Sequence, residues 1–118
     1  MTDTTPSDTT APTDTTHTQA VVDGYFACWN TTDEATRAEG VAATWTPDAT
    51  STDPVAAVAG HDELTAMFAA FHDTYPGHAF RQQGALDAHH DVVRWGWEMV
   101  DSAGTVVLDG IDCASLAD

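Results

Sequence analysis

The sequence predicts an α+β domain in which three helices pack on one face of a curved, mostly antiparallel sheet. Apolar residues recur at helical spacing up to about residue 75, and from His78 onward they alternate with a period of two. Three glycines fall inside the predicted strands, where glycine often marks a bulge or bend: Gly84, Gly96 and Gly110. At 118 residues the chain is long enough for one hydrophobic core but not for two.

The first fifteen residues differ in composition from the rest of the chain. They are mostly Thr, Asp, Pro and Ser, and they contain too little apolar surface to offset the entropy lost on ordering. We therefore expect a disordered leader over residues 1–15 and a single domain over residues 16–118. No signal-peptide pattern or membrane-length apolar run is present, so a cytoplasmic protein is expected.

Three segments have the periodicity of helices. The first follows a capping-box pattern, Thr16 with Gln19, and carries the stripe Val22, Tyr25, Phe26 and Trp29. The second follows another such pattern, Thr31 with Glu34, and runs to about Trp45 with Ala38, Val41, Ala42 and Trp45 facing inward. The third begins after Gly60, carries Leu64, Met67, Phe68, Phe71 and Tyr75, and stops at Pro76-Gly77.

The strands follow from alternation and from turn residues. A short strand over Ala49–Asp53 should end at Pro54, which cannot donate to a sheet ladder. Three longer strands are predicted at about His78–Leu86, Val92–Val100 and Thr105–Leu116. In the middle one, Val93, Trp95, Trp97 and Met99 share a face.

One acid in the last strand is in an unusual setting. Alternation places Asp112 on the same face as Val106, Leu108, Gly110, Ala114 and Leu116. A carboxylate among buried aliphatic side chains must find a partner or keep its proton, so Asp112 is a candidate functional residue. A shift of one residue in register would instead turn Asp112 to water, and the pattern alone leaves both placements open.

The charge balance restricts the class of partner. Nineteen acidic residues stand against three arginines, and there is no lysine. This surface repels nucleic acids and anionic membranes, so neither is expected as a partner. Acids spread along the whole chain, with Thr and Ala abundant, are also typical of proteins from salt-accumulating halophiles.

Most of the usual catalytic motifs are missing. The histidines show no HxH or HExxH spacing, so no metal is expected. Cys28 and Cys113 have no CxxC spacing and are interpreted as small buried hydrophobes. There is no glycine-rich phosphate loop and no GxSxG elbow. What remains is a set of carboxylates together with Tyr25, whose hydroxyl needs a partner inside the fold.

Several short segments resemble the nuclear transport factor 2-like superfamily, which includes ketosteroid isomerase, SnoaL-like polyketide cyclases and limonene epoxide hydrolase. The matching segments are Ala20-Val21-Val22 through Tyr25, Asn30 with Asp33, Asp48-Ala49-Thr50 through Asp53-Pro54-Val55, and Gly60 before a helix. The resemblance covers roughly residues 18 to 118. It implies a cone-shaped fold, with a curved sheet around a long helix and a pocket opening at one end.

The resemblance to ketosteroid isomerase implies roles for three residues. Asp53 matches the general base, Asp112 the protonated acid of the oxyanion hole, and Tyr25 the oxyanion-hole tyrosine. That enzyme is the standard example of a carboxylic acid kept neutral by an apolar site. Aromatic residues of the apolar stripes are the candidates for substrate contact: Trp29, Phe68, Trp95 and Trp97.

The expected function is cofactor-free proton transfer next to the carbonyl of a small apolar substrate. Two alternatives remain open, namely a non-catalytic binding or dimerisation module and an epoxide hydrolase in which the acids activate water. A homodimer is the expected assembly. Family members continue past Leu116-Ala117-Asp118 into one more strand, so either the chain is shortened there or something else covers that sheet edge.

Overall fold

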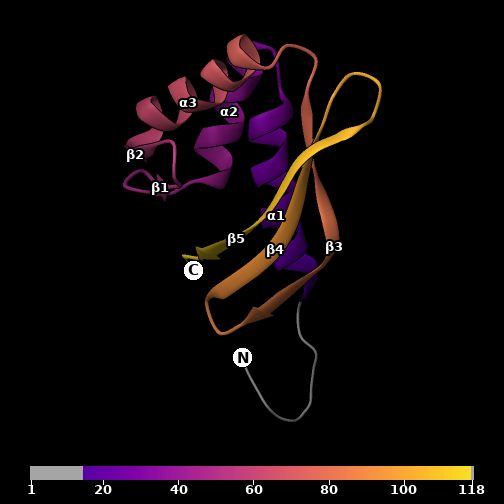
Figure 1. Cartoon of the computed structure of the whole chain (residues 1–118). Coiled ribbons are helices and arrows are strands. Elements are labelled where there is room, and N and C mark those ends of the chain that lie inside the picture. The colour runs from indigo at the N-terminus through magenta and orange to yellow at the C-terminus, as the bar shows by residue number, and fades with distance from the viewer. Residues whose placement is uncertain (1–14, 118) are drawn as a thin grey trace.

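The computed structural model describes residues 15–117 and confirms the α+β class (Figure 1). These residues form three helices, a two-stranded antiparallel sheet (β1-β2) and a three-stranded antiparallel sheet (β3-β4-β5). In chain order the elements are α1 (Thr15–Asn30), α2 (Glu34–Thr44), β1 (Thr50–Thr52), β2 (Ala57–Ala59), α3 (Gly60–Thr74), β3 (Ala79–His89), β4 (Val92–Val100) and β5 (Val106–Ser115). The leader predicted over residues 1–15 lies, except for Thr15, outside the described residues. No helix in residues 15–117 is long and apolar enough to cross a membrane.

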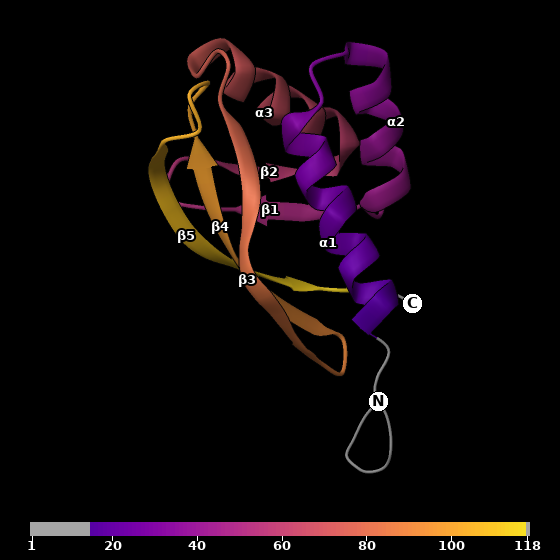
Figure 2. The ribbon, with the colours of Figure 1, turned by 90° about the vertical axis from the view of Figure 1, so that its right-hand side faces the viewer.

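The sheet β3-β4-β5 curves, and the helices gather on one side of it (Figures 1 and 2). α1 packs against β3 and against both other helices, while the small β1–β2 sheet packs against α3. The C-terminal end of β5 bends toward the side on which β1 lies (Figure 1). This curvature leaves room between α1, β1 and the end of β5.

The core consists of two clusters. One joins α1 to β4 through Val22, Phe26, Val93 and Trp95. The other lies within the helical layer and is formed by Cys28, Val41, Leu64 and Phe68. α1 contributes to both clusters because its apolar positions cover more than one side, so it is the element that ties the helices to the sheet.

The start of α2 differs from the sequence prediction. Asp33, not Thr31, is the N-cap, and its carboxylate accepts a hydrogen bond from the Thr36 amide at 2.9 Å. Arg37 is buried and donates to the backbone carbonyls of Thr31 and Thr32. The helix therefore turns Arg37 and Val41 inward. The predicted inward alanines, Ala38 and Ala42, are exposed.

Gln19 does not have the capping role predicted for it at the start of the first helix. The Gln19 amide donates to Asp23 on the next turn of α1, at 2.9 Å, and to Gln82 on β3, at 2.8 Å. The side chain therefore ties α1 to the sheet. A glutamine near the start of a helix can thus bond to a distant strand instead of capping its own helix.

The three long strands are confirmed, with one extension and one addition. β3 continues past Leu86 to His89, because Gly84, at φ +72°, forms a bulge between Gln83 and Asp87 and the pairing with β4 then resumes. The hairpin closes through His90, whose φ is 54°. β2 was not predicted, since three residues, Ala57–Ala59, are too few to show an alternation.

β5 has one buried and one exposed face over its C-terminal half. Gly110, Asp112, Ala114 and Leu116 are partly buried, while Ile111 is 65% exposed. The inward placement of Asp112 is therefore the correct one of the two that the sequence left open. Val106 and Leu108 lie before the covered part and are exposed. Within the described residues β5 pairs only with β4, so its outer edge is open.

Candidate active site

A cavity of about 600 Å³ opens between α1, the end of α2, β1 and the inner faces of β4 and β5. Its apolar wall includes Val21, Val22, Trp29, Val93 and Trp95. Hydroxyl side chains also line the cavity: Thr44, Thr46, Thr50, Ser51 and Thr52. The volume is in the range of about 300–1,000 Å³ that is usual for small-molecule sites. The lining thus combines apolar surface with hydroxyl groups that can form hydrogen bonds.

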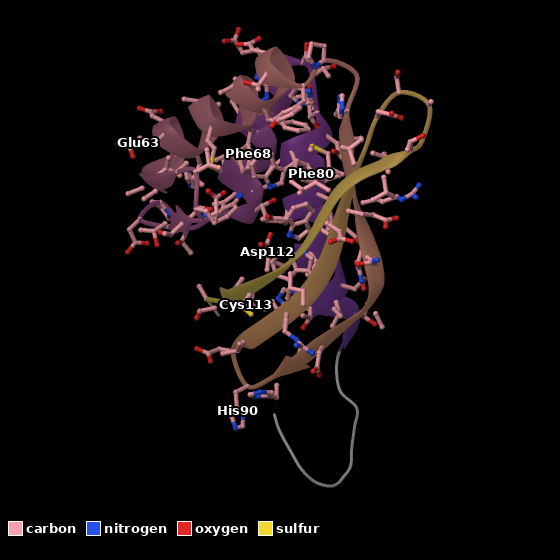
Figure 3. All side chains as sticks on the ribbon, viewed as in Figure 1. Glu63, Phe68, Phe80, His90, Asp112 and Cys113 are labelled. Atoms are coloured by element: carbon pink, nitrogen blue, oxygen red, sulfur yellow. The ribbon has the colours of Figure 1, made fainter. Side chains whose placement is uncertain are left out.

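Tyr25 and Asp112 meet at the wall of this cavity. Tyr25 lies on the sheet-facing side of α1, and its hydroxyl donates a hydrogen bond to Oδ2 of Asp112. Figure 3 shows Asp112 on β5, pointing toward the helices. Asp112 lies opposite Trp95 in the β4–β5 register, and the ring of Trp95 is 4.8 Å from that of Tyr25. The strand alternation that turns Asp112 inward thereby gives its carboxylate a partner.

The environment of Tyr25 keeps its hydroxyl protonated. Burial is the largest cause and raises the pKa of Tyr25 far above its ordinary value of 10.0. The negative charge of Asp112 and the hydrogen bond to it raise the pKa further, and the charge of Asp53 adds to this. A hydrogen bond from Trp29 acts in the opposite direction but is outweighed. Tyr25 is therefore a hydrogen-bond donor throughout the physiological pH range.

Asp53 lies at the rim of the same cavity, in the turn between β1 and β2. Its Oδ1 accepts hydrogen bonds from the amides of Val55 and Ala56, both at 2.8 Å. Its own amide donates to the Ala56 carbonyl at 2.9 Å. Oδ2 has no hydrogen-bond partner among residues 15–117, and the side chain is exposed. One oxygen thus holds the turn in place, while the other can accept a proton.

The structure brings together five of the seven residues proposed from the sequence. Tyr25, Asp53, Asp112, Trp29 and Trp95 all line the cavity.

Phe68 and Trp97 do not line the cavity, and their predicted placement is corrected. Phe68 is fully buried between the helices, in the helical layer seen in Figure 3. Trp97 lies over Gly110 and packs against Phe80, with a ring distance of 5.3 Å. Helical and strand periodicity identify buried faces, but they cannot separate a core position from a cavity wall.

Trp45 is a cavity residue that the sequence placed inward but not in the site. It is the C-cap of α2, and its carbonyl is bonded by Nε2 of His61 on α3 at 2.8 Å. His72 contacts the Trp29 carbonyl on α1 in the same way, at 2.7 Å. Both tryptophans are therefore held where a helix ends. The sequence feature that could have indicated this part of the cavity lining is the group of threonines and one serine around the first short strand.

The histidines and cysteines of the described residues do not form a metal site. In residues 15–117 no group of three or more His, Cys, Asp or Glu side chains could hold a metal ion. His89 and His90 lie at the tip of the β3–β4 hairpin, away from Asp112 (Figure 3). Cys28 is buried as predicted, but Cys113 is exposed, since it follows the inward-facing Asp112 on the strand.

The helices packed on one face of a curved antiparallel sheet are shared with nuclear transport factor 2-like proteins. The SnoaL-like domain family matches residues 22–118, and the chain belongs to this family. No curated protein matches the sequence.

Solved structures agree with this assignment. A candidate isomerase of the SnoaL-like family from Agrobacterium tumefaciens is 28% identical, with a TM-score of 0.83 over 86% of this chain and 87% of that one. A candidate SnoaL-like polyketide cyclase from Jannaschia sp. CCS1 is 18% identical, with a TM-score of 0.62 over 85% of this chain and 78% of that one. An NTF2-like protein of unknown function from Mesorhizobium loti is 14% identical, with a TM-score of 0.62 over 92% of this chain and 88% of that one. The last two likenesses concern the fold alone.

Proposed function

We propose that this protein is a cofactor-free enzyme that moves a proton next to the carbonyl of a small substrate. The observation that carries the proposal is the Tyr25–Asp112 hydrogen bond in the wall of a cavity whose rim holds Asp53. These residues provide a hydroxyl donor and a carboxylate base on two sides of one space. The likeness to a SnoaL-like candidate isomerase supports the same class of reaction.

In the proposed reaction Asp53 is the base. Its Oδ2 takes a proton from the carbon next to the carbonyl, and the C–H electron pair forms the carbon–carbon double bond of an enolate. Negative charge then develops on the carbonyl oxygen, where the Tyr25 hydroxyl donates a hydrogen bond. We propose that Asp112 carries a proton while substrate is bound. Tyr25 then no longer donates to Asp112, and both O–H groups can turn toward the carbonyl oxygen. Returning the proton from Asp53 to carbon completes the turnover.

The test is exchange of deuterium from heavy water into an aryl ketone such as acetophenone, followed by proton NMR. Asp53→Asn should lower the exchange rate by about a hundredfold or more while ketone affinity stays the same. The asparagine Oδ1 can accept the same two amide hydrogen bonds as Asp53 Oδ1, so the turn should survive.

Two further variants complete the test. Tyr25→Phe removes the donor to the oxyanion and should lower exchange by about a hundredfold. The matched control is Asp73→Asn, because Asp73 is an exposed acid on α3 that does not line the cavity. This variant should exchange deuterium at the wild-type rate. Wild-type exchange in Asp53→Asn would refute the assignment of the base. Ketone binding without any exchange would make the protein a binding module.

A further inference from the structure

Among residues 15–117, two acidic side chains and no arginine or lysine line the cavity. Asp53 and Asp112 line it, and Asp53 is the acid that keeps its charge when ligand is bound in the proposed reaction. Among residues 15–117, His17 is the one lining residue that could carry a positive charge. The sequence has no lysine, and all three arginines are engaged elsewhere. Arg37 donates to the Thr31 and Thr32 carbonyls inside the α1–α2 connection. No side chain of the lining can therefore form a fixed ion pair with a carboxylate or a phosphate.

The two remaining arginines lie on the sheet and pair with acids. Arg81 on β3 is 2.6 Å from Glu98. Arg94 lies 3.7 Å from Asp87, and it points away from the cavity because its strand neighbours Val93 and Trp95 face inward. Neither arginine is free to enter the site without leaving its partner. The acids of the cavity lining therefore have no arginine partner.

Aromatic rings surround the same space. The Tyr25 ring is 4.8 Å from Trp95, 6.1 Å from Trp45 and 6.5 Å from Trp29, and all four residues line the cavity. Aromatic faces attract ammonium groups through their quadrupole, and tryptophan does so best. Aromatic walls and nearby carboxylates together form a typical receptor for a cation. The net charge of −16 also concentrates cations near the cavity mouth.

We infer that the ligand of this cavity carries a positively charged group, such as an ammonium, and that carboxylates and phosphates are rejected. The inference rests on the proposed function in one respect only, namely that the ligand also carries a carbonyl group. Cation–aromatic contact and one nearby carboxylate together should favour a cationic ligand over a neutral ligand of the same shape by about tenfold. An anionic ligand of similar size should bind at least about tenfold more weakly than the neutral one.

Three ketones of similar shape test this inference. They are para-trimethylammonio-acetophenone, para-tert-butylacetophenone and para-acetylbenzoate, which carry a positive, a zero and a negative charge. Affinities are measured by calorimetry at about pH 8, where an unperturbed histidine carries little positive charge. The expected order of affinity is cation, neutral, anion. Equal affinity for the anionic and neutral ketones, or no advantage for the cation, would overturn the inference.

A pair of variants separates the cavity from the overall charge. Asp53→Asn and Asp73→Asn each remove one negative charge, but only Asp53 lines the cavity. Asp53→Asn should reduce the preference for the cation several-fold and leave the neutral ketone unaffected, while Asp73→Asn should change neither. An equal loss in both variants would show that net charge alone selects the ligand, which contradicts the inference.

Binding and exchange report on different claims. If the affinities follow the expected order but no ketone exchanges deuterium, the proposed function fails and the charge selection stands. If exchange occurs but the three affinities are equal, the charge selection fails and the proposed function stands.

Discussion

At the scale of single residues, Tyr25 combines burial, a charged partner and a position in the cavity wall. Its hydroxyl donates to Asp112, and both burial and that charge raise its pKa above the ordinary value of 10.0. A buried hydroxyl that stays protonated can stabilise an oxyanion without losing its own proton. The same property links Tyr25 to the pH dependence of folding.

We predict that Tyr25 makes the protein less stable as the pH rises above about 10. Below that pH the tyrosine is protonated in both the folded and the unfolded chain. Above it the unfolded chain releases the proton while the folded chain keeps it, so the free energy of unfolding falls. The slope from this residue should approach about 1.4 kcal/mol per pH unit. Urea denaturation between about pH 8 and 11 measures it.

The matched comparison is Tyr25→Phe, in which this part of the slope should disappear. Cys28 has a thiol pKa that is also raised by burial, but it titrates in both proteins, so the difference isolates Tyr25. Tyr75→Phe, at an exposed tyrosine, should keep the wild-type slope. Equal slopes in Tyr25→Phe and the wild type would show that Tyr25 is not protected in the folded state.

The sequence identified single residues better than it placed them. The alternation of β5 placed Asp112 on one face with Gly110 and Ala114 but left open whether that face points inward, and Tyr25 followed from the helical stripe. The same stripes suggested Phe68, which lies in the core. Whether a buried position borders a cavity depends on the curvature of the sheet and on how the helices cross it. One sequence does not contain that information in any local pattern.

At the scale of elements, the contact between β4 and β5 determines how the inner face of the sheet is filled. Trp97 and Gly110 are direct partners in the antiparallel register. A Cβ atom built on Gly110 would lie 2.5 Å from Cζ2 of Trp97, so the indole occupies the space that a side chain would take. The glycine lets Trp97 lie flat over the strand that carries Asp112 two residues later.

We predict that Gly110→Ala destabilises the protein by about 1–3 kcal/mol, the usual cost of overpacking. In most strands this substitution would be favourable, because glycine loses more entropy on folding. A double-mutant cycle with Trp97→Leu tests the cause, since the smaller side chain should relieve much of the cost. Urea denaturation of the four proteins gives the coupling energy. A coupling near zero would mean that the indole is not what excludes the methyl group.

The elements were predicted to different degrees for physical reasons. α3 and the three long strands have strong periodicity and clear turn residues at their ends, and their positions were close. The start of α2 was displaced because Asp33, not Thr31, caps it, and its inward face differed because the buried Arg37 donates to two backbone carbonyls. β2 exists through its pairing with β1, in the register Ser51 with Val58, which is a tertiary contact.

At the scale of the whole molecule, the excess of negative charge is the dominant feature. Nineteen acids and three arginines give a net charge of −16 on a chain of 118 residues. The ion pairs among residues 15–117 are two, Arg81 with Glu98 and Arg94 with Asp87. Most acids therefore repel one another in the compact state more than in the expanded chain.

We predict that stability rises steeply with potassium chloride. The Debye length falls from about 10 Å at 0.1 M to about 3 Å at 1 M, which removes most repulsion between exposed acids. A gain of only 1 kcal/mol would raise the Tm of a domain of this size by about 4–8 °C, so a calorimetric melt at each salt concentration measures it.

Screening must be separated from the general effect of salt on apolar surface. Replacing three exposed acids outside the cavity lining, Glu39→Gln, Asp73→Asn and Asp109→Asn, lowers the charge but leaves the buried apolar area unchanged. If screening is the cause, this variant should melt higher than the wild type at low salt and gain less from added potassium chloride. If salt acts through apolar surface, both proteins gain equally. A Tm that does not change with salt in either protein would remove the interpretation of the sequence as halophilic.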